Sequence, residues 1–152
     1  PIGDVDDGAG SAHLRLPPQR TIGEGYENES QDGRTVSVLM GKRLGFDQGR
    51  MYLSFSPFTQ LVATNDFAVL FLFTPRSTMH TDVDLYWLVD GNASQVDVGR
   101  MIWGWDETTK QDKVITENNQ AGILSKHYRP GRYLEHERRV VTFRQWYWDA
   151  VG

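Results

Sequence analysis

The chain has 152 residues, a formal net charge of −4 and no cysteine. Hydrophobic residues make up 39% and charged residues 24%, which fits one globular domain better than two. The acidic balance argues against a nucleic-acid partner, and the apolar run from Phe67 to Phe73 is too short for a membrane span. The missing cysteines exclude a disulfide framework, a thiolate zinc site and a cysteine-held iron–sulfur cluster in this chain. We expect a cytoplasmic domain.

Residues 1–35 are rich in Gly, Pro, Asp, Ser and Asn and show no apolar periodicity. Pro17-Pro18 and Asp32-Gly33 are turn signals within this stretch. We therefore expect an irregular N-terminal segment over 1–35, either a tail or a long loop packed on a partner. One domain then follows over 36–152.

Several strands are predicted after this segment. Apolar residues alternate with polar ones from Met51 to Phe55, and two further runs, Gln60–Thr64 and Phe67–Thr74, flank a two-residue turn at Asn65-Asp66. Phe67–Phe73 is apolar on both faces and predicts a central, buried strand. The next strand places its apolar residues on odd positions and ends at Asp90-Gly91-Asn92. Those apolar residues are Met79, Val83, Leu85, Trp87 and Val89.

The periodicity then changes to that of helices. One helix is expected from about Asp97, a second from about Gln111 to Leu124, and a last one from about Leu134 to Ala150. Strands followed by helices predict an α+β domain, with an antiparallel sheet that grips a long C-terminal helix.

The residues alone offer little catalytic chemistry. The four histidines, His13, His80, His127 and His136, have no spacing that brings two of them together as metal ligands, so surface positions explain them best. On a helix, Asp112 shares a stripe with Ile115, Asn119 and Gly122, and this stripe is expected to be buried. A buried carboxylate needs a cation, hydrogen bonds or a metal as its partner. The simpler alternative is a helix-start aspartate stabilised by the helix dipole, with an exposed polar face at Glu117–Gln120.

A longer motif adds to this interpretation. The run QDKVITENNQAGILSKHYRPGRYLEHERRVVTFRQWYW resembles the C-terminal signature of Rieske non-haem iron oxygenase α subunits, which hydroxylate aromatic rings or demethylate quaternary ammonium compounds. The matching positions combine acidic, amide, glycine and aromatic residues. They are Asp112, Glu117, Gln120, Gly122, Ser125, Tyr128, Pro130, Gly131, Glu137, Phe143, Trp146 and Tyr147. The family often has Ser where this chain has Leu134, so the start of the last helix is expected to be more weakly capped.

The resemblance implies a helix-grip, START-like fold that is incomplete in this chain, and a site built around Asp112. Asp112 matches the carboxylate ligand of a mononuclear Fe(II), with Glu117, Gln120 and Gly122 as its supporting motif. The two histidine ligands and the [2Fe–2S] Rieske cluster would come from earlier in the polypeptide. Met79, Val83, Leu85 and Trp87 share one strand face and are expected to line the substrate cavity.

The same resemblance implies a reaction of dioxygen with a small organic substrate, aromatic or quaternary amine. Electrons would come from a reductase or ferredoxin, and the subunits would form a homo-oligomer, a trimer in the family. Two alternatives stay open. In the first, the chain is a stand-alone helix-grip module that binds a small ligand without redox chemistry, and in the second it is an interaction subunit that presents Trp146, Tyr147 and Trp148 to a neighbour.

Overall fold

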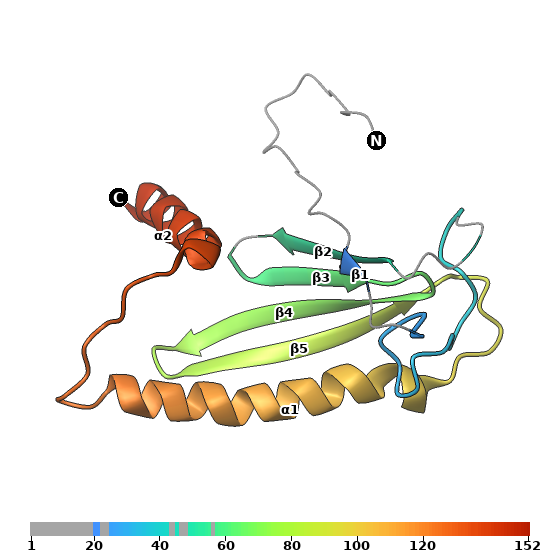
Figure 1. Ribbon diagram of the computed structural model, residues 1–152, viewed down its shortest axis with the longest axis horizontal. Coiled ribbons are helices and arrows are strands. Elements are labelled where there is room, and N and C mark those ends of the chain that lie inside the picture. The colour runs from blue at the N-terminus through green and yellow to red at the C-terminus, as the bar shows by residue number, and fades with distance from the viewer. Residues whose placement is uncertain (1–19, 22–24, 43–44, 46–48, 56) are drawn as a thin grey trace, which may run out of the picture.

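The computed structural model describes residues 20–21, 25–42, 45, 49–55 and 57–152. A short strand and four longer ones precede two α-helices and a short 3-10 helix (Figure 1). The elements are β1 (Arg20–Thr21), β2 (Gly49–Phe55), β3 (Thr59–Ala63), β4 (Phe67–Ser77), β5 (His80–Val89), α1 (Val98–Ile123), η1 (Glu135–Glu137) and α2 (Arg138–Val151). The expected α+β class, with a long helix along an antiparallel sheet, is confirmed.

The sheet is an antiparallel meander in which each strand pairs with the next along the chain. The predicted turn at Asn65-Asp66 is confirmed, because the Thr64 N–H donates to the Phe67 carbonyl across it at 2.9 Å. The longest pairing joins β4 to β5 and contains one irregularity between Pro75 and Ser77. Proline has no N–H for a ladder hydrogen bond, which accounts for an irregularity beside it.

One face of the sheet forms the hydrophobic core with α1. Phe67, Val69 and Phe71 of β4 point to this face and are buried, and Met101 of α1 completes the buried cluster from the other side. The Phe71 ring meets the Trp105 ring edge-on, with centroids 5.1 Å apart. The start of Phe67–Phe73 is therefore buried as predicted, whereas Phe73 at its end is only partly buried.

Helix α1 is continuous over 26 residues, so the prediction of two separate helices here is wrong. The polar stretch after Trp105 interrupts the apolar periodicity but contains no helix breaker. Lys110 bridges it by pairing with Asp106 at 2.6 Å and with Glu107 at 3.1 Å, one helical turn away. The Asp97 carboxylate accepts the N–H of Arg100 and caps the first turn.

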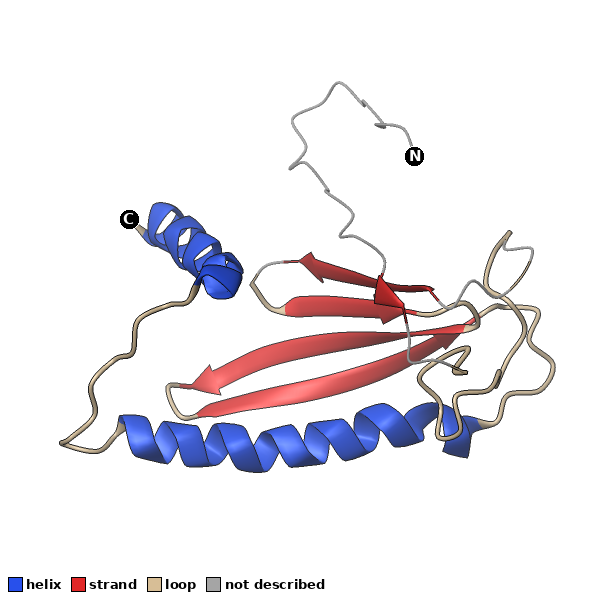
Figure 2. Ribbon diagram, viewed as in Figure 1, coloured by secondary structure: helices blue, strands red, loops and turns tan. Residues whose placement is uncertain are grey.

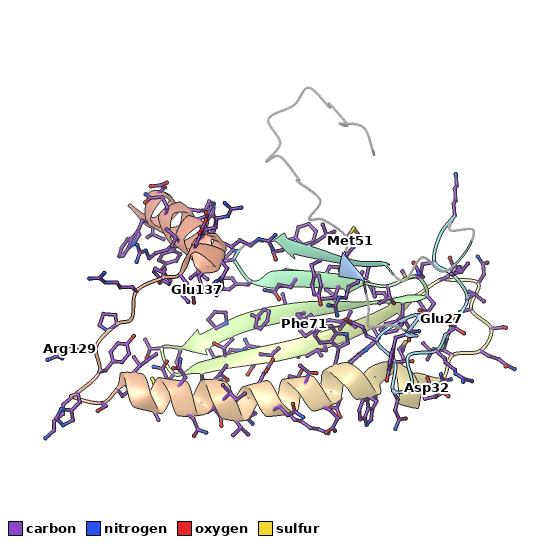
Figure 3. All side chains as sticks on the ribbon, in the orientation of Figure 1. Glu27, Asp32, Met51, Phe71, Arg129 and Glu137 are labelled. Atoms are coloured by element: carbon purple, nitrogen blue, oxygen red, sulfur yellow. The ribbon has the colours of Figure 1, made fainter. Side chains whose placement is uncertain are left out.

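The C-terminal helix stands apart from this core. An exposed segment that includes Arg129 leads from α1 to α2, and α2 lies beyond one end of the sheet (Figures 2 and 3). At the start of η1, which leads directly into α2, the Leu134 N–H donates to Glu137 Oε2 at 2.7 Å. Leu134 has no side-chain oxygen with which to return the bond, so only half of a capping box forms, as the sequence predicts.

The described part of the irregular segment packs on the domain as a loop. Asn28, Ser30 and Val36 are buried, and the N–H groups of Val36 and Ser37 donate to Asp66 Oδ2 at 2.8 and 3.3 Å. The Gln31 N–H also donates to the Arg100 carbonyl at 3.0 Å. The loop thus joins the β3–β4 turn to the start of α1.

Among the described residues, no helix has both the length and the apolar character that crossing a membrane requires.

Candidate functional site

The position of Asp112 follows from two contacts that α1 makes with the β4–β5 hairpin. Trp105 contacts Phe71 in the middle of β4, and Gln120 Nε2 lies 3.7 Å from Met79 Sδ at the turn between β4 and β5. Asp112 falls between them, about two helical turns after Trp105 and so on the same side of the helix. The sequence-predicted carboxylate therefore lies on the side of α1 that carries Trp105.

The side chain of Asp112 is exposed, and the stripe on which it was placed is not buried. Ile115 is 64% exposed, and Asn119 and Gly122 are exposed as well. The prediction of a buried stripe is wrong because the sheet-facing side of α1 is centred on Met101, Trp105 and Gln120 rather than on Ile115. No ion pair with a described residue occupies the Asp112 carboxylate.

Three of the four predicted cavity residues, Val83, Leu85 and Trp87, share one face of β5, whereas Met79 lies in the turn just before this strand, and the four differ in burial. Leu85 and Trp87 pack against the core cluster, whereas Val83 is 41% and Met79 57% exposed. Val83 pairs with Phe73, the residue at which the burial of β4 begins to decrease. Along this side of the hairpin, the side chains are therefore packed in the core at Leu85 and Trp87 and exposed to solvent at Val83 and Met79.

Helix α1 and the sheet share their buried contacts near the start of the helix. They are packed together where Met101 and Trp105 meet β4, and the helix is exposed from Lys110 to Asn119. Asp112 lies within this exposed stretch of the helix.

The three supporting residues of the motif have different surroundings. Glu117 lies 3.9 Å from Lys113 in an exposed i,i+4 pair. Gln120 holds the far end of α1 to Met79, and the Gly122 carbonyl accepts the Ser125 N–H at 3.1 Å as the helix ends. None of these three residues contacts Asp112 by a hydrogen bond in the structure.

Histidines do not gather at Asp112. His80 Nε2 lies 2.9 Å from Asp82 on the hairpin, while His127 and His136 lie after α1, and His13 falls outside the described residues. Nowhere in the described ranges do three His, Cys, Asp or Glu side chains cluster closely enough to hold a metal ion. The described residues therefore supply one exposed carboxylate and do not by themselves fit a mononuclear iron site.

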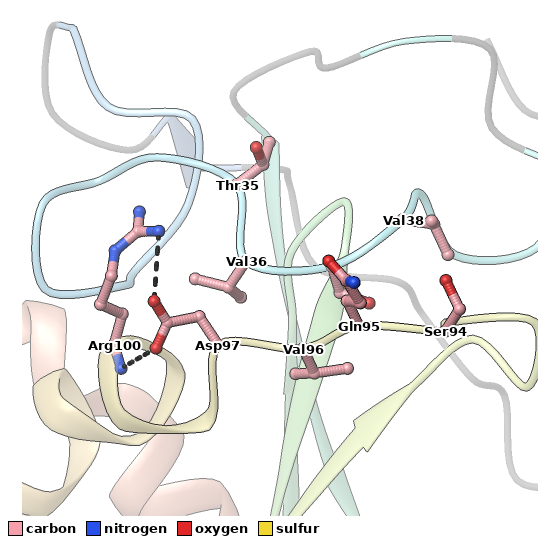
Figure 4. Close-up of a pocket in the computed structure, with 9 residues that line it drawn as sticks. Thr35, Val36, Val38, Ser94, Gln95, Val96, Asp97 and Arg100 are labelled. Carbon is pink, nitrogen blue, oxygen red and sulfur yellow. Dashed lines mark hydrogen bonds and ion pairs between the residues drawn. The ribbon is translucent and has the colours of Figure 1, made fainter.

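A separate hollow of about 520 Å³ opens beside the start of α1, away from the predicted site (Figure 4). Arg100 and Asp97 line it, joined by a hydrogen bond from the Arg100 N–H and an ion pair at 3.7 Å. Arg100 also pairs with Asp32, and its guanidinium holds the pKa of the Asp32 carboxyl below its usual value. The hollow is open and polar, and it contains none of the predicted site residues.

The sequence interpretation missed the group that positions α1. Asn28, Asp66 and Arg100 link the loop, the β3–β4 turn and the start of the helix, yet each lies far from the others in sequence. The one available signal was the turn at Asn65-Asp66, and nothing in it indicates that Asp66 is fully buried.

Comparison with known proteins decides the family. The family described as "Ring hydroxylating alpha subunit (catalytic domain)" matches residues 6–152. The chain belongs to this family. It is similar to the glycine betaine monooxygenase oxygenase subunit of Chromohalobacter salexigens, with 35% identity over 133 residues, and to that of Pseudomonas aeruginosa, with 34% identity over the same length.

The alignment covers 84% of this chain in both comparisons, but only 30% of the Chromohalobacter protein and 31% of the Pseudomonas protein. The chain therefore spans less than a third of the length of the curated relatives it matches. Their names describe whole oxygenase subunits, and the family match confirms the resemblance drawn from the C-terminal motif.

Proposed function

We propose that this chain is part of the catalytic domain of a Rieske-type oxygenase α subunit that monooxygenates a small quaternary ammonium compound. The family match over residues 6–152 carries the oxygenase part of the proposal. The substrate class is supported by the two relatives, which are named for glycine betaine, a trimethylammonium carboxylate. This choice replaces the open alternative between an aromatic and a quaternary amine substrate.

The role proposed for Asp112 is that of a single carboxylate ligand to iron. Two histidines and one carboxylate are the usual protein ligands of non-haem iron oxygenases, and when bound the metal supplies the activation of dioxygen. Because the histidines of the described residues do not gather at Asp112, the histidine ligands and the Rieske cluster are assigned to other parts of the intact subunit. Affinity depends on the number and geometry of the ligands, so no iron step is assigned to this chain alone.

The chain's own contribution is to hold the carboxylate over an apolar face. Packing of Met101 and Trp105 on β4 fixes the base of α1, and the Gln120–Met79 contact holds its far end. Between these points Val83 and Leu85 offer an apolar strand surface to the methyl groups of a substrate. Aromatic side chains that pack against the core here, among them Trp105 and Phe73, are of the kind that attract a quaternary ammonium.

The overall reaction is balanced as follows. Hydroxylation of an N-methyl group consumes dioxygen, two electrons and two protons, and it releases water. The N-hydroxymethyl product then loses formaldehyde and a proton and leaves the tertiary amine. The electrons are assigned to a reductase or ferredoxin partner, because the subunit's substrate does not supply them.

The decisive experiment uses the α subunit that contains this chain, supplied with a reductase and NADH. We expect dioxygen-dependent release of formaldehyde from glycine betaine. Asp112→Ala should lower this rate by at least about 100-fold and remove iron from the mononuclear site while leaving the Rieske absorption spectrum unchanged. Asp149→Ala, an exposed carboxylate on α2, is the matched control and should change neither rate nor iron content.

Two results would overturn the proposal. Full iron occupancy in the Asp112→Ala subunit would show that Asp112 is not a ligand of the iron. Hydroxylation of aromatic substrates, without formaldehyde from any N-methyl compound, would keep the oxygenase assignment and reject the substrate class.

A further inference from the structure

The sheet face that points toward α1 changes in character from one row of side chains to the next. The strand registers align two such rows across β2, β3, β4 and β5. The first row is aliphatic or aromatic throughout and consists of Tyr52, Val62, Val69 and Trp87. The second row, nearer the β4–β5 turn, consists of Ser54, Gln60, Phe71 and Leu85. Half of the second row is therefore polar.

The two polar residues of the second row lie where the hydrophobic core ends on β2 and β3. Strand alternation places Gln60 on the same side of the sheet as Val62, and Ser54 on the same side as Tyr52. Val62 belongs to the buried core cluster and Tyr52 packs against it. Ser54 and Gln60 face each other across β2 and β3, and both are exposed. An apolar surface is therefore followed by a pair of hydrogen-bonding side chains on the same face.

A group of three aromatic rings lies beside this polar pair. Gln60 pairs directly with Phe71 on the next strand. The Phe71 ring stacks on the Phe73 ring, with centroids 6.4 Å apart and planes at 12°, and it meets the Trp105 ring edge-on. Phe73 is only partly buried, so this aromatic group reaches the surface at one end. Neighbouring strands lie about 4.8 Å apart, which brings the Gln60 amide within reach of a small molecule held on the Phe73 ring.

This arrangement matches the two ends of a betaine. In glycine betaine a single methylene group separates the trimethylammonium group from the carboxylate, so both ends must be recognised close together. Aromatic ring faces attract a quaternary ammonium, and amide and hydroxyl groups donate hydrogen bonds to a carboxylate. Arg50 lies on the same side of β2, but it is paired with Glu29 and stands 4.9 Å over the Tyr52 ring. Its charge is therefore already compensated, and the neutral donors of the second row are better placed.

We propose that Gln60 and Ser54 bind the carboxylate of the substrate while the aromatic group at Phe73 holds its trimethylammonium end. This assignment rests on the function proposed above and names what the site selects, a carboxylate next to a quaternary nitrogen. Choline carries the same ammonium group with a hydroxymethyl group in place of the carboxylate, so it loses the charge-assisted hydrogen bonds. A site that hydrogen-bonds one substrate group discriminates against an analogue that lacks this group.

Calorimetric titration of the oxidised α subunit that contains this chain tests the assignment without turnover, with glycine betaine and choline as the two ligands. Gln60→Leu removes the amide at similar size and should raise the Kd of glycine betaine by at least about 10-fold, while the Kd of choline stays within about threefold. Gln60→Glu places a like charge against the carboxylate, so it should weaken glycine betaine further without weakening choline. Ser54→Ala should act in the same direction as Gln60→Leu. Thr59→Val, on the opposite face of β3, is the matched control and should change neither Kd.

The outcomes separate this assignment from the proposed function. A loss confined to glycine betaine in both Gln60 variants supports carboxylate binding by this row. If the unchanged subunit binds both compounds and the Gln60 variants bind glycine betaine equally well, the assignment fails and the proposed function stands. Equal losses for both compounds in Gln60→Leu would make Gln60 a packing residue and reject the assignment as well. An unchanged subunit that binds neither compound would reject the substrate class and this assignment together.

Discussion

The side-chain amide of Asn28 donates to both carboxylate oxygens of Asp66, at 3.0 and 2.9 Å, and both residues are completely buried. Asp66 also accepts the N–H groups of Val36 and Ser37, and the Thr64 hydroxyl lies 3.4 Å from its other oxygen. A buried carboxylate is stable only when it is paired or hydrogen-bonded, and here neutral donors provide that stabilisation. This carboxylate therefore fastens the loop to the β3–β4 turn.

Replacing Asp66 should be costly. Asp66→Ala removes the acceptor of several buried donors, and we expect the free energy of unfolding to fall by about 3–5 kcal/mol. Asp66→Asn keeps the shape of the side chain, but its N–H₂ group faces N–H donors and cannot accept from them. The free energy of unfolding should therefore fall by about 2–3 kcal/mol. Chemical denaturation monitored by tryptophan fluorescence measures both. Asp84→Asn, at an exposed position of β5, is the control and should cost little, and an equally small loss at Asp66 would contradict the role of Asp66 in holding the loop.

Two glycines of α1 should respond to alanine in opposite directions. A Cβ at Gly104 would lie 2.7 Å from the Glu29 carbonyl oxygen, whereas a Cβ at Gly122 meets nothing within 4 Å. Gly104→Ala should therefore destabilise the domain by about 1–3 kcal/mol, because loop and helix must separate. Gly122→Ala should stabilise it by up to about 1 kcal/mol through helix propensity. Thermal unfolding distinguishes the two, and a gain at both positions would show that the loop does not press on α1.

The pairing of Asp32 with Arg100 predicts a pH dependence. The Arg100 guanidinium, helped by the Arg34 N–H, lowers the pKa of Asp32 from its ordinary value of 3.8. A carboxyl whose pKa is lower in the folded state stabilises the fold above its ordinary pKa, and this stabilisation is lost as the pH falls through the folded-state pKa. The stability lost in Asp32→Asn should be constant near neutral pH and shrink below pH about 4.

Denaturant titrations of both proteins at several pH values measure this difference. The pair is exposed to solvent, so added salt should reduce the difference at neutral pH as well. A difference that stays the same from neutral to acidic pH would mean that the Asp32 charge does not act through Arg100.

Asp112 should be dispensable for folding. Its side chain is exposed and forms no ion pair with a described residue, so Asp112→Asn should change the free energy of unfolding by no more than about 0.5 kcal/mol. Loss of activity in the same variant would then be a direct effect on the site. Urea denaturation of the isolated chain measures the stability, and a loss of several kcal/mol would indicate a structural role for Asp112 instead.

Local patterns predicted much of the fold. Alternation located the strands from Met51 to Val89, and the pair Asn65-Asp66 located the turn between β3 and β4, because both signals depend only on neighbouring residues. The continuity of α1 was missed because the polar residues Asp106 and Lys110 interrupt the apolar pattern while their ion pair supports the helix. The packing of the loop on Asp66 was also missed, since it depends on residues 38 positions apart.

The candidate site was predictable only in part. The motif around Asp112 led to the family, but among the described residues no hydrogen bond or ion pair joins that carboxylate to the strand face that the sequence had singled out. The burial of Ile115 was predicted wrongly, because periodicity gives the spacing of a stripe but does not tell which side of a helix meets the sheet. Whether Met79, Val83, Leu85 and Trp87 line a substrate cavity stays a prediction.

Helix α1 packs on the core through Met101 and Trp105 near its start, whereas near its end a single side-chain contact, between Gln120 and Met79, joins it to the hairpin. Bending of the helix would move its middle more than its packed start, so the carboxylate of Asp112 should shift while Trp105 stays in place. The stiffness of α1 between Trp105 and Gln120 would then determine how precisely the Asp112 carboxylate is positioned. A bulky group bound between Val83 and α1 would change the position of the Asp112 carboxylate without contacting Asp112.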